Sequence, residues 1–276
     1  MEDLSKVDSL IMEVEKTLTK SSYFDGKDNL KIGVDLGTSH ITITVLDWRE
    51  KPVACAMELA QVVRDGLVVD YSGAVNIVKR LKREIEQRIG VDLIKAAIAV
   101  PPGTGKRDSD THRYVVEAAG MEVISVVDEP TAANNVLSIK DGAVVDIGGG
   151  TTGLSIIESG NVVYTADEPT GGTHLSLVIA GNYKVKFEEA DNIKRDKARH
   201  REITPLVLPV VQKMASIINC HTRGFRINNI YLVGGTSCLT GIEDIIERET
   251  GINTIKPYNP LLVTPVGIAL SCYLRE

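Results

Sequence analysis

The sequence predicts an α/β protein made of two similar halves that face each other across a central cleft. The main observation is a repeated pattern, in which an apolar strand carrying an aspartate is followed by a glycine turn and a second strand. One copy covers residues 31–46 and the other covers residues 143–157. Each copy continues into a third apolar run, at 52–57 and at 161–166. A single glycine turn between strands is ordinary, but two copies that both keep the aspartate indicate a duplicated unit whose turns hold one ligand.

The two turns predict an anion-binding site. In the first copy Asp35 precedes Gly37, Thr38 and Ser39, and in the second copy Asp146 precedes a run of glycines. Backbone N–H groups in such a turn converge on one point, which suits a phosphate group. A carboxylate beside that point would repel phosphate unless a cation lies between them. We therefore expect a divalent metal ion beside Asp35, most simply Mg²⁺ that keeps its water ligands.

The composition is that of an ordinary globular protein. The chain has 276 residues, enough for two modest domains or one large one, with 25% charged and 43% hydrophobic residues. The net charge of −6 argues against a general nucleic-acid binder and against an anionic membrane surface as a partner. We expect no bilayer-spanning segment, because no apolar run looks long enough, and no signal peptide. The scattered cysteines predict reduced thiols in a cytoplasmic protein.

Residues 1–30 are expected to form a separate N-terminal segment. Apolar residues recur every three or four positions from Leu4 to Leu18, with charged residues between them, which predicts an amphipathic helix. The helix should end near Ser21, and the polar stretch over 25–29 indicates a linker. The favoured interpretation is that this helix packs on the body of the protein. The alternative is an exposed helix that docks on a partner or targets a cargo.

The rest of the chain divides into a first domain at 31–140 and a second at 141–276. After the last strand of the first domain a helix begins, and Pro130 suits its first turn because that position needs no N–H. Glu129 would then stand at the helix entrance, near the sheet end that carries ligands in such folds. In the last expected helix, Gly267 leaves room for a close neighbour. Other helices and strands are expected at 73–88, 96–100, 107–119, 123–127, 205–223, 230–233 and 264–274.

Residues 100–107 resemble the phosphate loop of AAA-type ATPases. They follow a strand and precede a helix, as that loop requires. However, Val100 replaces the first glycine, and Arg107 replaces the hydroxyl residue that would bind Mg²⁺. We therefore expect no nucleotide site here, and Lys106→Ala should leave nucleotide binding largely intact.

Three features together resemble the actin-like ATPase superfamily: the repeated glycine hairpins, the stretch Glu129–Ala133 and the stretch Val233–Thr236. This superfamily includes actin, sugar kinases, bacterial cell-shape proteins and DnaK-type chaperones. The resemblance covers about residues 30–274. It implies two ribonuclease-H-like domains of duplicated topology, with a central nucleotide cleft and small outer subdomains. Within the superfamily the chain is most similar to a chaperone-like group of ethanolamine-utilisation proteins.

The resemblance also implies roles for individual residues, with ATP or ADP and Mg²⁺ as ligands. Asp35 and Asp146 would hold Mg²⁺ through water, and Glu129 would orient or activate the attacking water. Phosphoryl transfer to water then requires alignment, charge neutralisation and amide donors rather than covalent help from the protein. The implied nucleotide-binding residues are Gly37, Thr38, Ser39, His40, Gly148, Gly149, Gly150, Thr151, Thr152, Gly171, Gly172, Asp191, Lys194, Gly234, Gly235 and Thr236.

These residues would contact different parts of the nucleotide. Gly171 and Gly172 would approach the phosphates, and Asp191 with Lys194 would reach the nucleoside. Two positions depart from the chaperone pattern: Gly153 stands where those proteins have a second aspartate, and Cys238 stands where they have an arginine beside adenine. The sequence also offers no clear match for their catalytic lysine. We therefore expect slow or partner-stimulated hydrolysis rather than fast turnover.

The expected function is that of an ATP-dependent chaperone or assembly factor, whose domains close on nucleotide and drive the release of a protein partner. The resemblance implies ethanolamine-degrading enzymes or microcompartment components as candidate partners, while the net charge argues against nucleic acid and membrane. It also implies a cytoplasmic location, with association with a bacterial microcompartment. The alternatives are a filament-forming bacterial actin-like protein, a small-molecule kinase, and a nucleotide-binding scaffold without significant turnover.

Overall fold

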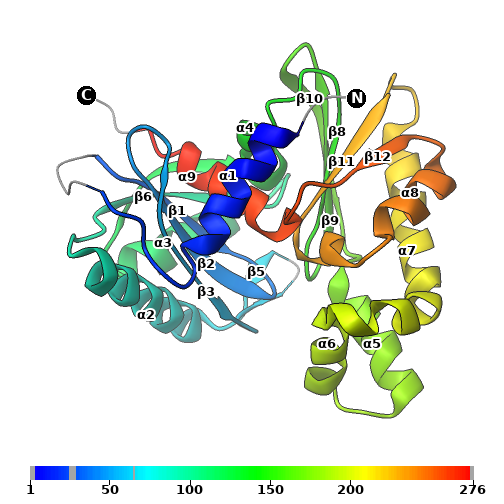
Figure 1. Ribbon diagram of the computed structural model, residues 1–276, viewed down its shortest axis with the longest axis horizontal. Helices are drawn as coiled ribbons and strands as arrows, with labels where there is room; N and C mark the ends of the chain where they lie inside the picture. The colour runs from blue at the N-terminus through cyan, green and yellow to red at the C-terminus, as the bar shows by residue number, and fades with distance from the viewer. Residues whose placement is uncertain (1–3, 25–28, 65, 274–276) are drawn as a thin grey trace.

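The computed structural model describes residues 4–24, 29–64 and 66–273, and these residues form two five-stranded sheets and one short two-stranded ribbon. Figure 1 shows the two large sheets in separate halves of the molecule, with helices packed on them. Residues 25–28 of the expected linker lie outside the described residues.

The first sheet has the strand order β3-β2-β1-β6-β7. The repeated unit forms its antiparallel part, in which β2 pairs with both β1 and β3, while β6 and β7 run parallel to β1. The strands are β1 (Lys31–Leu36), β2 (His40–Leu46), β3 (Pro52–Leu59), β6 (Lys95–Val100) and β7 (Glu122–Asp128).

The second sheet repeats this topology, with the order β10-β9-β8-β11-β12. Here too the first three strands form an antiparallel unit, and the last two run parallel to its first strand. The strands are β8 (Gly142–Ile147), β9 (Thr152–Glu158), β10 (Asn161–Glu168), β11 (Asn229–Val233) and β12 (Asn253–Ile255). The duplicated topology predicted from the two hairpins is therefore confirmed. Asp35 and Asp146 take equivalent positions, one residue before the ends of β1 and β8.

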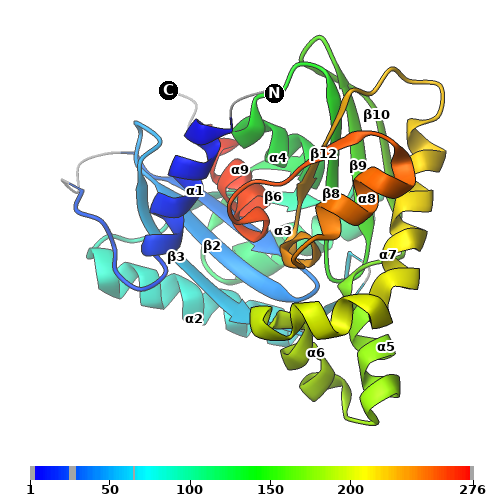
Figure 2. The same ribbon diagram turned by 45° about the vertical axis from the view of Figure 1, so that its right-hand side comes forward.

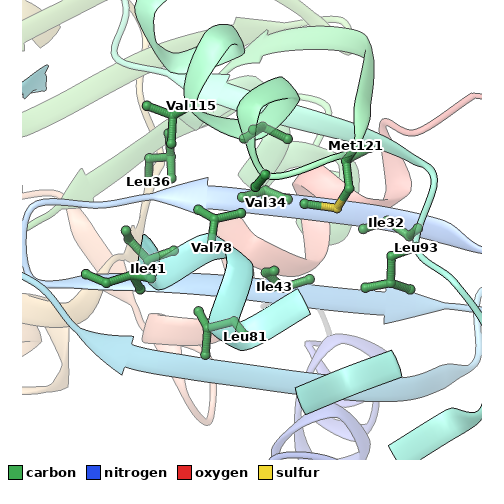
Figure 3. Packing of buried hydrophobic residues seen from close by; sticks show 14 of the residues in the cluster. Ile32, Val34, Leu36, Ile41, Ile43, Val78, Leu81, Leu93, Val115 and Met121 are labelled. Carbon is green, nitrogen blue, oxygen red and sulfur yellow. The ribbon is translucent and has the colours of Figure 1, made fainter. Parts of the chain in front are cut away.

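Helix α2 (Tyr71–Ile89) covers the first sheet and shows why the sequence folds locally as it does. The Asp70 carboxylate accepts a hydrogen bond from the Gly73 N–H at 2.9 Å and so caps the start, and Gly90 ends the helix with a left-handed φ of 72°. Figure 3 shows Val78 and Leu81 of this helix packed among apolar side chains of β1 and β2. The short strands β4 (Val63–Arg64) and β5 (Leu67–Val68) precede it.

The remaining helices of the two halves flank the sheets, and α5 and α6 project away from the second sheet as a small outer part (Figure 1). The flanking helices are α3 (Lys106–Ala118), α5 (Gly172–Tyr183), α6 (Phe187–Arg195), α7 (His200–Thr222) and α8 (Ile242–Thr250). Short 3₁₀ turns are η1 (Lys197–Arg199), η2 (Gly235–Cys238) and η3 (Pro260–Leu262).

Helix α7 differs from two expectations. It begins at His200 rather than at Pro205, so that Pro205 and Pro209 both lie inside it, and each removes one backbone N–H donor from the helix. In addition, η1 and α7 form one segment, Lys197–Thr222, that is long and apolar enough to cross a membrane by length and composition alone. The expectation that no segment reaches that length was wrong. Core helices of soluble proteins can have the same length and apolar composition. In α7, Val207 and Val211 are fully buried in the core of the second half.

Helices α4 (Glu129–Leu137) and α9 (Val263–Leu270) pack together between the two sheets. A Cβ at Gly267 would overlap the Ala132 carbonyl oxygen of α4, and a Cβ at Gly33 of β1 would overlap the Ala269 backbone nitrogen. The close neighbour predicted for Gly267 is therefore confirmed. Helix α9 therefore packs against both α4 and the first sheet. Gly267 and Gly33 have no Cβ, which lets these backbones come this close.

The N-terminal helix α1 (Ser5–Lys16) packs on the body, as the favoured interpretation predicted. Its apolar residues Val7, Ile11 and Val14 are buried in a core that includes residues of both sheets and of α9. Figures 1 and 2 both show α1 beside α9. After the helix, the Ser22 N–H donates to the Val53 carbonyl at 2.8 Å, so the segment also pairs with the edge strand β3.

Candidate functional site

A cleft with a volume of about 370 Å³ lies between the two halves. Both hairpin turns line it, together with the start of α4, the turn η2 and the start of α9. This volume is within the range of small-molecule sites. The site therefore forms where the ends of β1, β7, β8 and β11 meet, as expected for ligands at the carboxyl ends of parallel strands.

Three carboxyl groups converge in this cleft: Asp35, Glu129 and Asp146. Burial raises the pKa of Asp35 to about 7, and the negative charge of Asp146 adds to the shift. Burial likewise raises the pKa of Glu129 well above its usual range, with Asp146 and then Asp35 adding to it. Because the charge of Asp146 raises the pKa of both Asp35 and Glu129, and all three line the cleft, the two aspartates face a common space, as predicted from the sequence.

Asp146 is held from two sides. The Thr264 hydroxyl of α9 donates to Asp146 Oδ2 at 2.6 Å, which opposes the rise in the pKa of Asp146 that burial causes. On the other side Gly234, with a φ of 87°, lies so close that a Cβ there would overlap Asp146 Oδ1. Thr264 was missed in the sequence because it lies 118 residues from Asp146 and no local pattern links them.

The two hairpin turns contact each other across the cleft. A Cβ at Gly149 would overlap Ser39 Oγ and would come within 3.3 Å of Thr38 Cβ. Glycine at this position lets the turns approach this closely, because a Cβ would force the Ser39 hydroxyl to turn away. The predicted residues that line the cleft are Asp35, Gly37, Thr38, Ser39, His40, Glu129, Asp146, Gly148, Gly149, Gly150, Thr151, Lys194, Gly234, Gly235 and Thr236.

Four other predicted residues lie behind the second turn rather than on the cleft wall that the described residues form: Thr152, Gly171, Gly172 and Asp191. The Gly172 N–H donates to the Gly148 carbonyl at 3.0 Å, and the Thr152 hydroxyl donates to the Thr170 carbonyl at 2.6 Å. Gly171 and Gly172 pack against the second turn, where a Cβ at Gly171 would overlap the Gly149 and Gly150 backbones. These residues position the turn that lines the cleft.

Lys194 lines the cleft and also contacts the residues behind the second turn. Its ammonium donates to the Gly172 carbonyl at 3.1 Å, to Ser176 Oγ at 2.9 Å and to Asp191 Oδ1 at 2.6 Å. Burial lowers the pKa of Lys194 to about 8. Asp191 also forms an ion pair with Arg195, so this carboxylate holds two cations at the cleft rather than contacting the cleft itself.

His40, in the first turn, faces these cations. Burial lowers the pKa of His40 to about 4, and the positive charges of Arg195 and Lys194 add to the shift. The imidazole is therefore neutral at pH 7, with one nitrogen able to donate a hydrogen bond and the other able to accept one.

The cleft also contains residues that the sequence reasoning did not assign. Besides Thr264 they include Glu15, Arg195, Lys197, His200 and Asn259. Arg195 lies four residues after Asp191 in a charged helix, so helical spacing could have suggested it. Glu15 had no such signal, because the amphipathic pattern of the N-terminal helix identifies only the buried face.

The residues fit a phosphate ligand together with a divalent cation. The fit rests on the two glycine turns in contact and on the carboxyl groups whose pKa values burial raises, because a cation between them would favour their charged forms. Within the described ranges, the side chains of His, Cys, Asp and Glu form no cluster of three or more that could hold a metal ion directly.

Comparisons with known proteins identify the relatives of this chain. A family model described as "Type IV pilus assembly protein PilM" matches residues 109–264. The ethanolamine utilization protein EutJ of Salmonella typhimurium is 44% identical over 243 residues, which cover 88% of this chain and 85% of the relative. EutJ of Escherichia coli K12 is 41% identical over 261 residues, covering 94% of this chain and 92% of the relative.

Solved structures give the same relationship. The crystal structure of EutJ from Carboxydothermus hydrogenoformans has a TM-score of 0.91 at 47% identity and covers 96% of this chain and 98% of that one. A structure of the PilM–PilN type IV pilus biogenesis complex has a TM-score of 0.74 at 14% identity, over 89% of this chain and 98% of that one, and shows the shared fold.

Proposed function

The chain belongs to the EutJ family of ethanolamine utilization proteins, within the wider PilM family with the actin-like ATPase fold, and from this premise we propose that it binds ATP with Mg²⁺ in the central cleft. We further propose that it hydrolyses ATP slowly and serves ethanolamine utilisation as a chaperone-like or assembly factor. The actin-like fold and the link to ethanolamine utilisation come from the relatives. The ligand, its turnover and the chaperone role are our proposals.

The convergence of Asp35, Glu129 and Asp146 carries the proposal. Burial raises the pKa of Asp35 and Glu129, and repulsion from neighbouring carboxylates adds to it, so the charged forms of these groups are costly in the cleft. A bound Mg²⁺ would supply positive charge that stabilises both these carboxylates and the phosphate oxygens. The glycine turns line the same space, and turns of this kind can offer backbone N–H groups to a phosphate.

Each half contributes to the proposed chemistry. Thr264 fixes one oxygen of Asp146, and the turns would orient the phosphates through N–H donors. Glu129 stands at the first position of α4, where it can orient a water molecule and accept its proton on a carboxyl oxygen. A raised pKa makes the ionised Glu129 carboxylate a stronger proton acceptor, which supports this role.

A protein partner is the final part of the proposal. PilM, which shares this fold, forms a type IV pilus biogenesis complex with PilN, so the fold serves as a partner-binding module in that system. We propose ethanolamine-degrading enzymes or microcompartment components as partners for this chain. A cytoplasmic location, in association with a microcompartment, would follow from such partners.

The test compares Asp146→Asn with wild type by calorimetry with ATP and Mg²⁺ and by ATP hydrolysis with and without candidate partner enzymes. Asparagine has the same shape and can still accept the Thr264 hydrogen bond, so the fold should persist. Asp92→Asn, at an exposed aspartate outside the cleft, is the matched control. We expect Asp146→Asn to weaken binding at least tenfold and Asp92→Asn to leave it unchanged. Equal binding and turnover in all three proteins would refute the site, and no binding to wild type would refute the proposed function.

A further inference from the structure

Glu15 of the N-terminal helix lines the cleft, although its helix precedes both halves of the duplicated fold. Its carboxylate accepts a hydrogen bond from Asn259 Nδ2 at 2.8 Å, and the Tyr258 hydroxyl also interacts with it. The side chain is half-buried. Glu15 is thus held in a fixed place by the loop that follows β12.

That loop connects Glu15, through Asn259 and Leu261, to the η2 turn of the cleft. Asn259 Oδ1 accepts from the Leu261 N–H at 3.3 Å, and Leu261 lies against Gly235, where a Cβ would come within 3.2 Å of its Cδ1. Thr236, which follows Gly235 in η2, donates its hydroxyl hydrogen to the Gly148 carbonyl of the second turn at 2.7 Å. Glu15 therefore lies beyond the η2 turn, away from the phosphate-binding end.

The surroundings of Glu15 suit an uncharged, donor-bearing part of a ligand. Cys238, Leu239 and Leu261 line the same part of the cleft with weakly polar or apolar surface. A carboxylate has about four acceptor positions, and Asn259 and Tyr258 use two of them. Acceptor positions therefore remain, whereas a phosphate group would be repelled by this charge.

We propose that Glu15 contacts the nucleoside of the bound nucleotide, so that helix α1 is a wall of the nucleotide site and not only an arm packed on the body. This rests on the proposed function. The donor is either a ribose hydroxyl or the amino group of the base, since both offer hydrogen to a carboxylate. Because α1 also holds the second half through Asp8, whose Oδ1 accepts from the Tyr258 N–H at 2.8 Å, ligand binding and docking of α1 stabilise each other.

The test measures affinities of Glu15→Gln for ATP and for inorganic tripolyphosphate, with Mg²⁺, in the full chain. Glutamine keeps an acceptor for Asn259, so α1 should stay docked, which circular dichroism and the melting temperature check. The matched control is Glu13→Gln, which makes the same change on the same helix at an exposed position outside the cleft. Loss of a negative charge alone would strengthen the binding of any polyphosphate, so a loss of affinity is diagnostic.

We expect Glu15→Gln to weaken ATP binding about tenfold, the effect of losing one hydrogen bond to a charged group. Tripolyphosphate binding should be unchanged or slightly stronger, and Glu13→Gln should bind ATP like wild type. The penalty should vanish with 2′,3′-dideoxy-ATP if the donor is a ribose hydroxyl, and with inosine triphosphate if it is the base amino group.

Three results would overturn the inference. The first is wild-type ATP affinity in Glu15→Gln, the second is an equal loss for ATP and tripolyphosphate, and the third is a penalty that persists with both analogues. A wild-type protein that binds no nucleotide at all would overturn the proposed function and this inference together. In contrast, normal binding by Glu15→Gln overturns the inference alone.

Discussion

Replacement of Gly267 by alanine tests how the two halves are joined. Helix α9 carries Gly267 against α4, where an added Cβ would overlap the Ala132 carbonyl oxygen and come within 3.2 Å of the Ala133 nitrogen. These are backbone atoms, so no side-chain rotation can relieve the overlap. Helix α9 must shift, and on its other side the Ala269 backbone already lies against Gly33 of β1.

The expected cost follows from this geometry. Overpacking a well-filled core costs ~1–3 kcal/mol, and backbone overlap on a helix without free space belongs at the upper end. Gly267→Ala should therefore lower the free energy of unfolding by about 3 kcal/mol, or the melting temperature by roughly 6–12 °C for a chain of this size. A shift of α9 also moves Thr264 away from Asp146, so the affinity for ATP should fall as well.

Gly181→Ala is the matched control, since it makes the same change inside helix α5, where an added Cβ meets no atom within 4 Å. It should raise stability by ~0.5–1 kcal/mol, because alanine favours helix more than glycine. Urea and thermal unfolding of both variants give the measurement. If Gly267→Ala were as stable as Gly181→Ala, the close packing of α4 and α9 would be wrong.

Further predictions concern the charges. Without Mg²⁺, stability should fall as the pH rises from about 4 to about 7, by ~1.4 kcal/mol per unit for one proton, because the folded pKa of Asp35 is about 7 and its ordinary value is 3.8. Asp35→Asn should flatten this pH dependence in thermal melts while weakening ATP binding in calorimetry. Lys194→Met should lower the free energy of unfolding by about 2 kcal/mol in urea titrations, because it leaves the partly buried Asp191 with Arg195 as its remaining ion pair. Lys106→Ala, at an exposed residue outside the cleft, should leave the dissociation constant for ATP within about twofold of wild type, whereas a larger loss would mean that residues 100–107 bind nucleotide after all.

The duplicated fold could be predicted because its signals are local. An apolar strand, an aspartate and a glycine turn all lie within sixteen residues, and the pattern recurs with the aspartate in place. Glu129 could be placed for a similar reason, since the Asp128 cap and Pro130 define the start of α4 and the helix follows a strand. Local signals thus identified all three carboxyl groups.

Other parts of the site could not be predicted, because they depend on contacts between distant segments. The sequence assigned α9 to the second domain, whereas the contact of its Ala269 backbone with Gly33 shows that it also packs on the first sheet. Thr264 reaches Asp146, and Glu15 reaches Asn259 across 244 residues. Neither pair has a periodicity or spacing that marks it in the sequence.

The buried carboxyl groups themselves argue for a ligand. Folding gives no benefit from Asp35, Glu129 and Asp146 in one cleft, because burial and mutual repulsion raise the pKa of each of the first two. Apolar or amide side chains of similar size would relieve that cost. Thr264 offsets part of it for Asp146 alone. An arrangement that destabilises the empty protein, yet is framed by glycine turns that allow close approach, is best explained by a cation-bearing ligand whose binding stabilises the charges.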